Sequence, residues 1–178
     1  MIIDRGTATL IAAIIAAISS LIVLFLKRDA EIRTARRNSL EKYISDLSSY
    51  IHQLIATSNI LLKAKTLESQ TNWEEKAENA KDQLKKIRPE LTYSLWGIDS
   101  SLQTLSRLPD FTAYTLADNE IAKKVVKRGT KLGETINKCI KNCYLNGRAP
   151  NWWEIRKIKF FEWRFRKVRD DYKKSKSA

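Results

Sequence analysis

The hydrophobic pattern begins with an uncharged run of 21 residues, 6–26, which ends abruptly at Lys27 and Arg28. As a helix rising about 1.5 Å per residue, this run is roughly 31 Å long, which matches the hydrocarbon core of a bilayer. A buried core helix and a cleaved signal peptide are the alternatives. The run is longer than a signal-peptide core and has fewer polar side chains than a core helix usually has. We therefore predict a transmembrane signal-anchor over residues 1–27.

The charges on either side of the run predict its orientation. Only Arg5 precedes it, whereas six cations follow within 20 residues: Lys27, Arg28, Arg33, Arg36, Arg37 and Lys42. Positively charged flanks stay in the cytoplasm. We expect a single-pass protein of the inner (cytoplasmic) membrane, with its N-terminus outside and residues 28–178 in the cytoplasm.

Small residues recur every four positions along the run, at Ala8, Ala12, Ala16 and Ser20. Rows of this kind allow transmembrane helices to approach closely and associate. The pattern predicts self-association into a homo-oligomer, the alternative being that alanine is merely tolerated in lipid.

Apolar residues spaced alternately four and three apart predict a bundle helix from Leu40. Its stripe is Leu40, Ile44, Leu47, Ile51, Leu54, Ser58 and Leu61. Nothing between Lys27 and Asn38 forces a break, so the membrane helix can continue into this one. A turn is predicted at residues 68–72, with Asn72 and Glu75 capping the next helix.

The next helix carries the stripe Trp73, Ala77, Ala80, Leu84 and Ile87, and we expect a break or kink at Pro89. The stripe resumes as Leu91, Leu95, Ile98, Leu102 and Leu105, and this section is expected to end at residues 108–110. After an aromatic connector containing Phe111 and Tyr114, a helix is predicted over residues 119–145. Gly129 and Gly133 in it either permit close helix approach or are a soft spot.

Composition supports this reading, because the chain has only five Gly and three Pro and lacks alternating β-branched runs. The predicted fold class is all-α: a single N-terminal transmembrane helix followed by a cytoplasmic antiparallel bundle of about four to five helices. The bundle is the basic domain of residues 28–178, and one domain of that size can bury its own core.

The last predicted helix, from Trp152 to about Lys174, has two distinct faces. Ile158, Phe161, Phe165, Val168 and Tyr172 form an apolar face that can dock on the bundle. The other face interleaves aromatic and basic residues: Trp153, Arg156, Lys159, Phe160, Trp163, Arg164, Arg166 and Lys167. That combination suits a subunit interface, anionic lipid headgroups or RNA, and the sequence leaves the three open.

A net charge of +13 points to acidic partners of the same kinds, lipid or nucleic acid. The sequence contains no Gly-rich phosphate loop, GxSxG elbow or HExxH, so we expect no enzyme activity, cofactor or small-molecule substrate. Cys139 and Cys143 are the only cysteines and there is one histidine. We expect the two cysteines to be small buried side chains, and we expect no zinc site.

A membrane span at residues 6–26, the juxtamembrane Lys27 and Arg28 and a helical basic remainder together resemble the small membrane accessory proteins of type VI-B CRISPR systems. The resemblance implies a HEPN-like helical domain, an RNA-guided nuclease or RNA as partner, and an oligomeric pore that strengthens antiviral defence. HEPN ribonucleases carry an Arg and a His separated by four to six residues, but at those distances before His52 lie Ser45, Asp46 and Leu47, so no catalytic residue is carried over.

The sequence therefore predicts a membrane-anchored, self-associating antiviral defence effector that acts by pore formation or membrane permeabilisation. The alternative is a membrane-tethered adaptor or scaffold whose basic, aromatic C-terminal helix binds RNA or anionic lipid without forming a pore. The span itself offers few polar side chains to line a channel.

Overall fold

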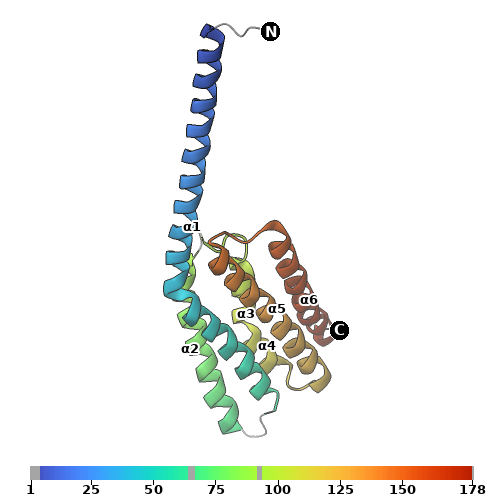
Figure 1. The fold of residues 1–178 in the computed structure, drawn as a ribbon. Helices are drawn as coiled ribbons and strands as arrows, with labels where there is room; N and C mark the ends of the chain where they lie inside the picture. The colour runs from blue at the N-terminus through green and yellow to red at the C-terminus, as the bar shows by residue number, and fades with distance from the viewer. Residues whose placement is uncertain (1–4, 64–66, 92–93, 178) are drawn as a thin grey trace.

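The computed structural model describes residues 5–63, 67–91 and 94–177, which form six α-helices and no strand (Figure 1). The helices are α1 (Arg5–Leu61), α2 (Leu67–Leu91), α3 (Asp99–Ser106), α4 (Leu108–Thr115), α5 (Asn119–Asn146) and α6 (Trp152–Ser177). The all-α prediction is confirmed. The end of α5 and the start of α6 agree with their predicted positions to within one residue.

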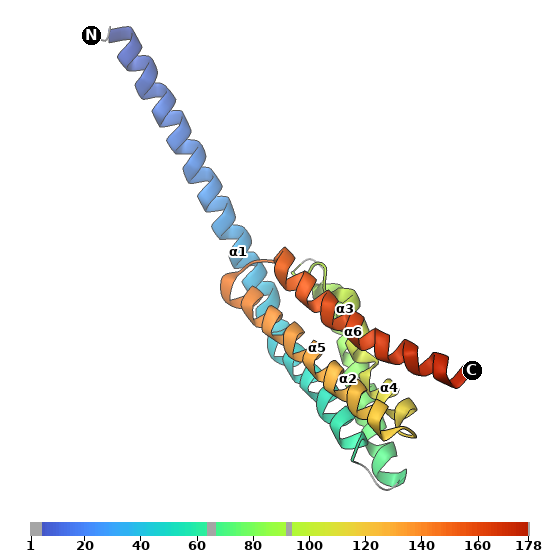
Figure 2. The same ribbon diagram turned by 90° about the vertical axis from the view of Figure 1, so that its right-hand side faces the viewer.

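Helix α1 is a continuous 57-residue helix, of which the first half projects away from the rest of the chain (Figures 1 and 2). Every described side chain between Thr9 and Leu26 is exposed, including the large apolar ones. This helix is long and apolar enough to cross a membrane. The apolar segment does continue into the first bundle helix without a break, as the sequence allowed.

The second half of α1 packs between α2 and α5, and α5 also packs against α6. Helix α1 runs antiparallel to both α2 and α5, and α5 runs antiparallel to α6 (Figure 1). The predicted stripes supply the core. Its fully buried members include Leu40, Leu47, Ile51, Leu84, Leu102, Leu132, Ile136, Ile158 and Phe165. Burial of these faces supplies the main stabilisation of the fold.

Gly129 and Gly133 permit close approach between helices. A Cβ at Gly133 would lie 2.6 Å from Cδ1 of Ile55 on α1, and a Cβ at Gly129 would overlap the side chain of Leu108 on α4. The structure therefore favours close packing over a soft spot, the two readings that the sequence left open.

Three predicted boundaries are wrong. Helix α2 begins at Leu67, so residues 68–72 are not a turn and Asn72 is not a cap. It also continues past Pro89 to Leu91, where a proline costs little because only the final turn loses a backbone hydrogen bond. The residues expected to form a stop at 108–110 and a connector carrying Phe111 and Tyr114 instead form α4. Pro109 is tolerated in its first turn, where the missing N–H has no helical partner in any case.

The α5–α6 turn is fixed against α1 by Gly147. This residue ends α5 in the left-handed conformation, φ 59°, and a Cβ there would lie 2.6 Å from the backbone oxygen of Arg33. The side chain of Arg37 donates a hydrogen bond of 2.5 Å to the carbonyl of Leu145 in the same turn. Glycine is required at position 147 both for its backbone conformation and for this contact.

We expect Gly147→Ala to lower the free energy of unfolding by at least ~2 kcal/mol, because it combines left-handed strain with a clash against backbone. Denaturant or thermal unfolding of the full chain in detergent measures the change. Lys138→Ala, an exposed position on the same helix, is the control and should stay within about 0.5 kcal/mol of the unmodified protein. A Gly147→Ala variant as stable as this control would contradict the assigned contact.

Candidate functional site

The net charge of the chain is concentrated in its last two helices. Residues 119–178 contain 18 Lys and Arg against six Asp and Glu, which accounts for +12 of the net +13. The preceding 118 residues, including the whole of α1, are nearly balanced. Any acidic partner attracted by the charge of this protein is therefore attracted chiefly to α5 and α6.

A groove between α5 and α6 gathers these charges. It consists of two hollows, of about 490 and 320 Å³, that share Lys124, Arg128 and Arg164 in their walls. Six cations line the groove, four from α5 and two from α6: Lys124, Lys127, Arg128, Lys131, Arg164 and Lys167. Asp171 is the one acidic side chain in the walls of the two hollows. We call this surface the basic groove.

Helix geometry explains why the α5 cations lie together. Positions 124, 127, 128 and 131 are three or four residues apart and so share one face of a helix. The neighbouring face of α5 carries Val125, Leu132 and Ile136, which are buried in the core. Packing of that apolar face turns the lysines outward beside α6. A hydrogen bond of 2.7 Å from the Arg128 guanidinium to the carbonyl of Arg164 joins the two walls.

The cations of the groove are largely available for a ligand. Within the described residues, no ion pair neutralises Lys124, Lys127, Arg164 or Lys167, and the exposed Lys131 lies 3.3 Å from Glu134. An exposed ion pair of that kind contributes little to stability, so Lys131 can readily exchange Glu134 for another anion.

Two exposed aromatic side chains lie on α6 at the groove's edge. Trp163 lines the groove, and its ring centroid is 6.3 Å from that of Phe160. The Nζ atom of Lys167 is 5.6 Å from the centre of the Trp163 ring, and the Arg164 guanidinium is 5.7 Å from that of Phe160. Apolar ring faces beside cations provide both stacking surface and charge.

The structure divides the aromatic-basic face predicted on the last helix. Phe160, Trp163, Arg164 and Lys167 lie at the groove, whereas Trp153 and Arg156 lie one to three turns away near the start of α6. Lys159 and Arg166 instead turn toward α3 and bind Glu162. The predicted apolar face is confirmed, since Ile158, Phe165, Val168 and Tyr172 are buried.

Glu162 is a buried carboxylate that fastens α6 to α3. It accepts hydrogen bonds from Ser101 (2.7 Å) and Thr104 (2.8 Å), and it forms ion pairs with Lys159 (3.0 Å) and Arg166 (2.6 Å). Burial raises the pKa of the Glu162 carboxyl, but these bonds outweigh it and hold the pKa below its ordinary value. Because they serve this clamp, Lys159 and Arg166 contribute less charge to the groove than their sequence positions indicate.

The sequence interpretation missed the α5 half of the groove. Lys124, Lys127, Arg128 and Lys131 do show a signal in the sequence, namely their spacing along one helical face. Their proximity to Arg164 and Lys167 is a tertiary contact, which no local pattern contains.

The predicted self-association row lies on the projecting part of α1. Ala12, Ala16 and Ser20 are exposed, and the Ser20 hydroxyl donates a hydrogen bond of 2.8 Å to the carbonyl of Ala16. Ala8 belongs to α1, but its side chain lies outside the described part of the chain.

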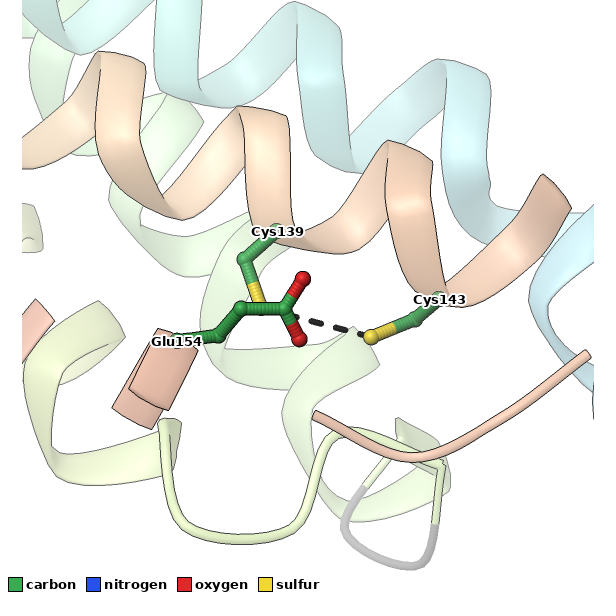
Figure 3. Close-up of side chains that lie close together, drawn as sticks. All are labelled: Cys139, Cys143 and Glu154. Atoms are coloured by element: carbon green, nitrogen blue, oxygen red, sulfur yellow. Dashed lines mark hydrogen bonds between the residues drawn. The ribbon is translucent and has the colours of Figure 1, made fainter. Parts of the chain in front are cut away.

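Cys139 and Cys143 lie near Glu154 at the end of α5 (Figure 3). Their sulfur atoms are 4.0 Å apart, and a Glu154 carboxylate oxygen lies within 4.8 Å of both. The hydrogen bond with Cys143, together with burial, raises the pKa of the Cys139 thiol, which disfavours the thiolate that binds metals.

Both oxygens of Glu154 are already used in the α5–α6 turn. The Arg148 guanidinium donates to both, at 2.9 and 2.8 Å, while the Asn142 amide and the Asn151 backbone N–H donate one bond each. The Asn151 side chain in turn accepts from the Glu154 N–H at 2.8 Å, which forms the capping box of α6. A metal ion here would have to displace Arg148, and zinc would still need a fourth ligand. The geometry assigns Glu154 to the turn.

Comparisons with protein-family models, curated proteins and solved structures give no match for this chain. The resemblance to the type VI-B accessory proteins therefore stays a prediction.

The Arg148 hydrogen bonds lower the pKa of Glu154 to about 2 from 4.5. Since the pKa is lower in the folded state, the resulting stability is fully present above pH 4.5 and is lost as pH falls toward 2. We expect Glu154→Gln to cost about 2 kcal/mol of unfolding free energy at neutral pH, with the difference shrinking across that acidic window.

The measurement is the unfolding free energy of the full chain across a pH series. Glu134→Gln, which alters an exposed surface pair, is the matched control and should change stability by less than about 0.5 kcal/mol. A Glu154→Gln penalty that stayed constant between neutral and acidic pH would show that the charge of Glu154 is not the cause.

Proposed function

We propose that this protein is a membrane-anchored adaptor that holds single-stranded RNA in the basic groove between α5 and α6. In this proposal the first half of α1 crosses the membrane, and the bundle lies on the cytoplasmic side. In this proposal the protein binds RNA and holds it at the membrane, and it does not act as a catalyst.

Membrane anchoring is supported by the apolar half of α1. No other described part of the chain covers these side chains, and exposing such a long apolar surface to water is unfavourable. The cytoplasmic placement is supported by the cations directly after the span, Lys27, Arg28 and Arg33, compared with Arg5 alone before it.

The single observation that carries the RNA proposal is the convergence of six cations from two helices on one groove. Phosphates of a nucleic acid recur along a strand, so they can meet several such cations at once, and each contact releases counterions. Trp163 and Phe160 at the edge add ring faces on which unpaired bases can stack.

Distance favours nucleic acid over lipid as the groove's ligand. The C-terminal end of α5 contacts α1 at Arg33, close to the membrane span. Lys131 lies 16 residues earlier on α5, which places it about 24 Å further along that helix. Charges are screened within about 8 Å at physiological salt, so the groove and the lipid surface interact little. A ligand from the aqueous phase fits better.

The proposal predicts that Lys124→Ala/Arg164→Ala/Lys167→Ala weakens binding of an unstructured RNA of about 16 nucleotides. The slope of log K against log salt should fall by about 2 in magnitude, since each lost phosphate contact removes about 0.7 for a single strand. Fluorescence anisotropy with the full chain in detergent, over a salt series, measures both quantities.

The control removes the same number of charges from elsewhere. Lys85, Lys86 and Lys138 are exposed and lie outside the groove, so the triple alanine variant at these positions should keep the unmodified salt slope. Equal losses in the two triple variants would mean that net charge rather than the groove binds RNA. A groove variant that binds RNA normally would contradict the proposal.

A second candidate function, the oligomeric membrane pore, is favoured by the exposed row of Ala12, Ala16 and Ser20. Small residues on a helix face that no other described part of the chain covers can bring two copies of α1 together. The Ser20 hydroxyl already bonds to its own helix, so the row is suited to close packing more than to lining a wet channel.

If the row is an interface, Ala12→Leu/Ala16→Leu should reduce the oligomer size in detergent, because larger side chains hold the helices apart. Ala13→Leu/Ala17→Leu makes the same change one step round the helix and should leave assembly intact. Light scattering gives the oligomer size, and dye release from liposomes tests permeability. A monomer that releases no dye would contradict the pore, and assembly unaffected by Ala12→Leu/Ala16→Leu would contradict the role of the row.

A further inference from the structure

Four large apolar side chains are exposed at the end of the bundle from which the first half of α1 projects. They are Trp96 (66% exposed), Leu145 (64%), Trp152 (58%) and Trp153 (71%). They come from the loop between α2 and α3, the last turn of α5 and the first turn of α6, so no single amphipathic helix accounts for them. We call these four residues the rim.

Contacts with α1 fix the level of the rim along that helix. The turn that carries Leu145 binds Arg37 through the Leu145 carbonyl, at 2.5 Å, and Gly147 of this turn packs on the Arg33 backbone. Arg33 and Arg37 follow Leu26, the last residue of the apolar run, by seven and 11 residues. The turn therefore meets α1 about 10–16 Å beyond the end of the run.

The loop containing Trp96 is held at the same level. A Cβ at Gly97 would lie 2.8 Å from Cδ1 of Ile155 in the first turn of α6, and the Ser94 hydroxyl bonds to that of Ser39 on α1 at 3.2 Å. Both views show this end of the bundle beside α1, with α6 starting there and running away from it (Figures 1 and 2).

Cations accompany the rim. The Arg156 guanidinium lies 5.0 Å from the centre of the Trp152 ring, and the rings of Trp152 and Trp153 meet edge to face at 4.5 Å. Arg33, Arg156 and Lys157 are exposed at this end. Indole rings next to cations match the layer where lipid headgroups meet acyl chains, and this layer lies directly beyond a transmembrane span.

We propose that the rim inserts into the headgroup layer of the membrane that α1 crosses and binds its anionic phospholipids. The inference rests on the proposed anchoring by α1, and it adds a second contact with the same bilayer. A helix that crosses a membrane alone leaves its soluble domain free to swing. Docking of the rim fixes the domain upright, so that the basic groove lies away from the lipid.

The position and the charge of the rim both favour the membrane as its binding partner. The rim is adjacent to the apolar surface of α1 and presents apolar rings with cations, whereas a second copy of this chain would bring the same positive charge to the contact. A subunit contact at the rim is the competing outcome of the test.

The test uses the full chain in liposomes and quenching of tryptophan fluorescence by lipids brominated near the headgroup end of their acyl chains. Trp73→Phe/Trp163→Phe leaves the three rim tryptophans. Trp96→Phe/Trp152→Phe/Trp153→Phe leaves Trp73 and Trp163, which lie on α2 and at the groove. Trp96, Trp152, Trp153 and Trp163 are exposed, and circular dichroism confirms folding of each variant.

We expect brominated anionic bilayers to quench about half of the rim fluorescence and little of the remainder, as for indoles at a membrane interface. Quenching should weaken in bilayers of neutral lipid or after Arg156→Glu/Lys157→Glu. Equal quenching of the two tryptophan sets would contradict insertion of the rim. Equal quenching in neutral and anionic bilayers would contradict its binding to anionic phospholipids. Rim tryptophans that are shielded from acrylamide in detergent and are not quenched by brominated lipid indicate a subunit contact, which also overturns the proposal.

Flotation of the liposomes after an alkaline wash distinguishes failure of the rim proposal from failure of the membrane anchoring on which it rests. A chain that does not float with the lipid is not anchored, and both proposals then fail. A chain that floats but whose rim tryptophans are unquenched keeps its anchor and loses only the rim.

Discussion

The continuity of α1 is the constraint on which the other features of this protein depend. One uninterrupted helix carries an apolar segment that no other described residue covers and, further along, the stripe around which the bundle packs. Because the helix is uninterrupted, the environment that accepts its first half sets how far from that environment the bundle lies. The bundle then has a defined near end and a defined far end. The α5–α6 turn lies at the near end, and the basic groove lies toward the far end.

The polar interactions of the bundle are concentrated where they fix α6. Glu154 and Arg148 hold the start of this helix at the α5–α6 turn, and Glu162 fastens its middle to Ser101 and Thr104 of α3. A carboxylate that is buried, as Glu162 is, or partly buried, as Glu154 is, is unfavourable without partners. The two carboxylates therefore specify one placement of α6 rather than adding general stability. Fixing α6 in this way is what allows Arg164 and Lys167 to face the α5 lysines across the groove.

Much of the fold could be predicted from periodicity. The stripes that begin at Leu40 and Trp73 identify buried faces, and the Asn151–Glu154 box gives the start of α6, because both signals are local. Boundaries at Leu67, Pro89 and Leu108 could not be predicted in the same way, since tertiary packing extends or starts a helix where local preference is weak. The site shows the same division. The aromatic-basic face of α6 is visible in the sequence. How the helices pack decides the rest: Lys159 and Arg166 pair with Glu162, and Lys124 and Lys131 lie in the same groove as Arg164.

If α1 spans the membrane and the rim docks on it, the domain stands upright on the membrane, with its near end at the lipid and its groove well away from it. Energy transfer from a dye on the full chain to acceptor lipids in the bilayer tests it most directly. The dye is placed at Lys157→Cys near the start of α6 or at Lys131→Cys in the groove, and the native cysteines are buried. We expect strong transfer from position 157 and much weaker transfer from position 131, which lies about 24 Å along α5 from the α5–α6 turn. Equal transfer from the two positions would mean that the domain lies flat or moves freely, and would contradict the account.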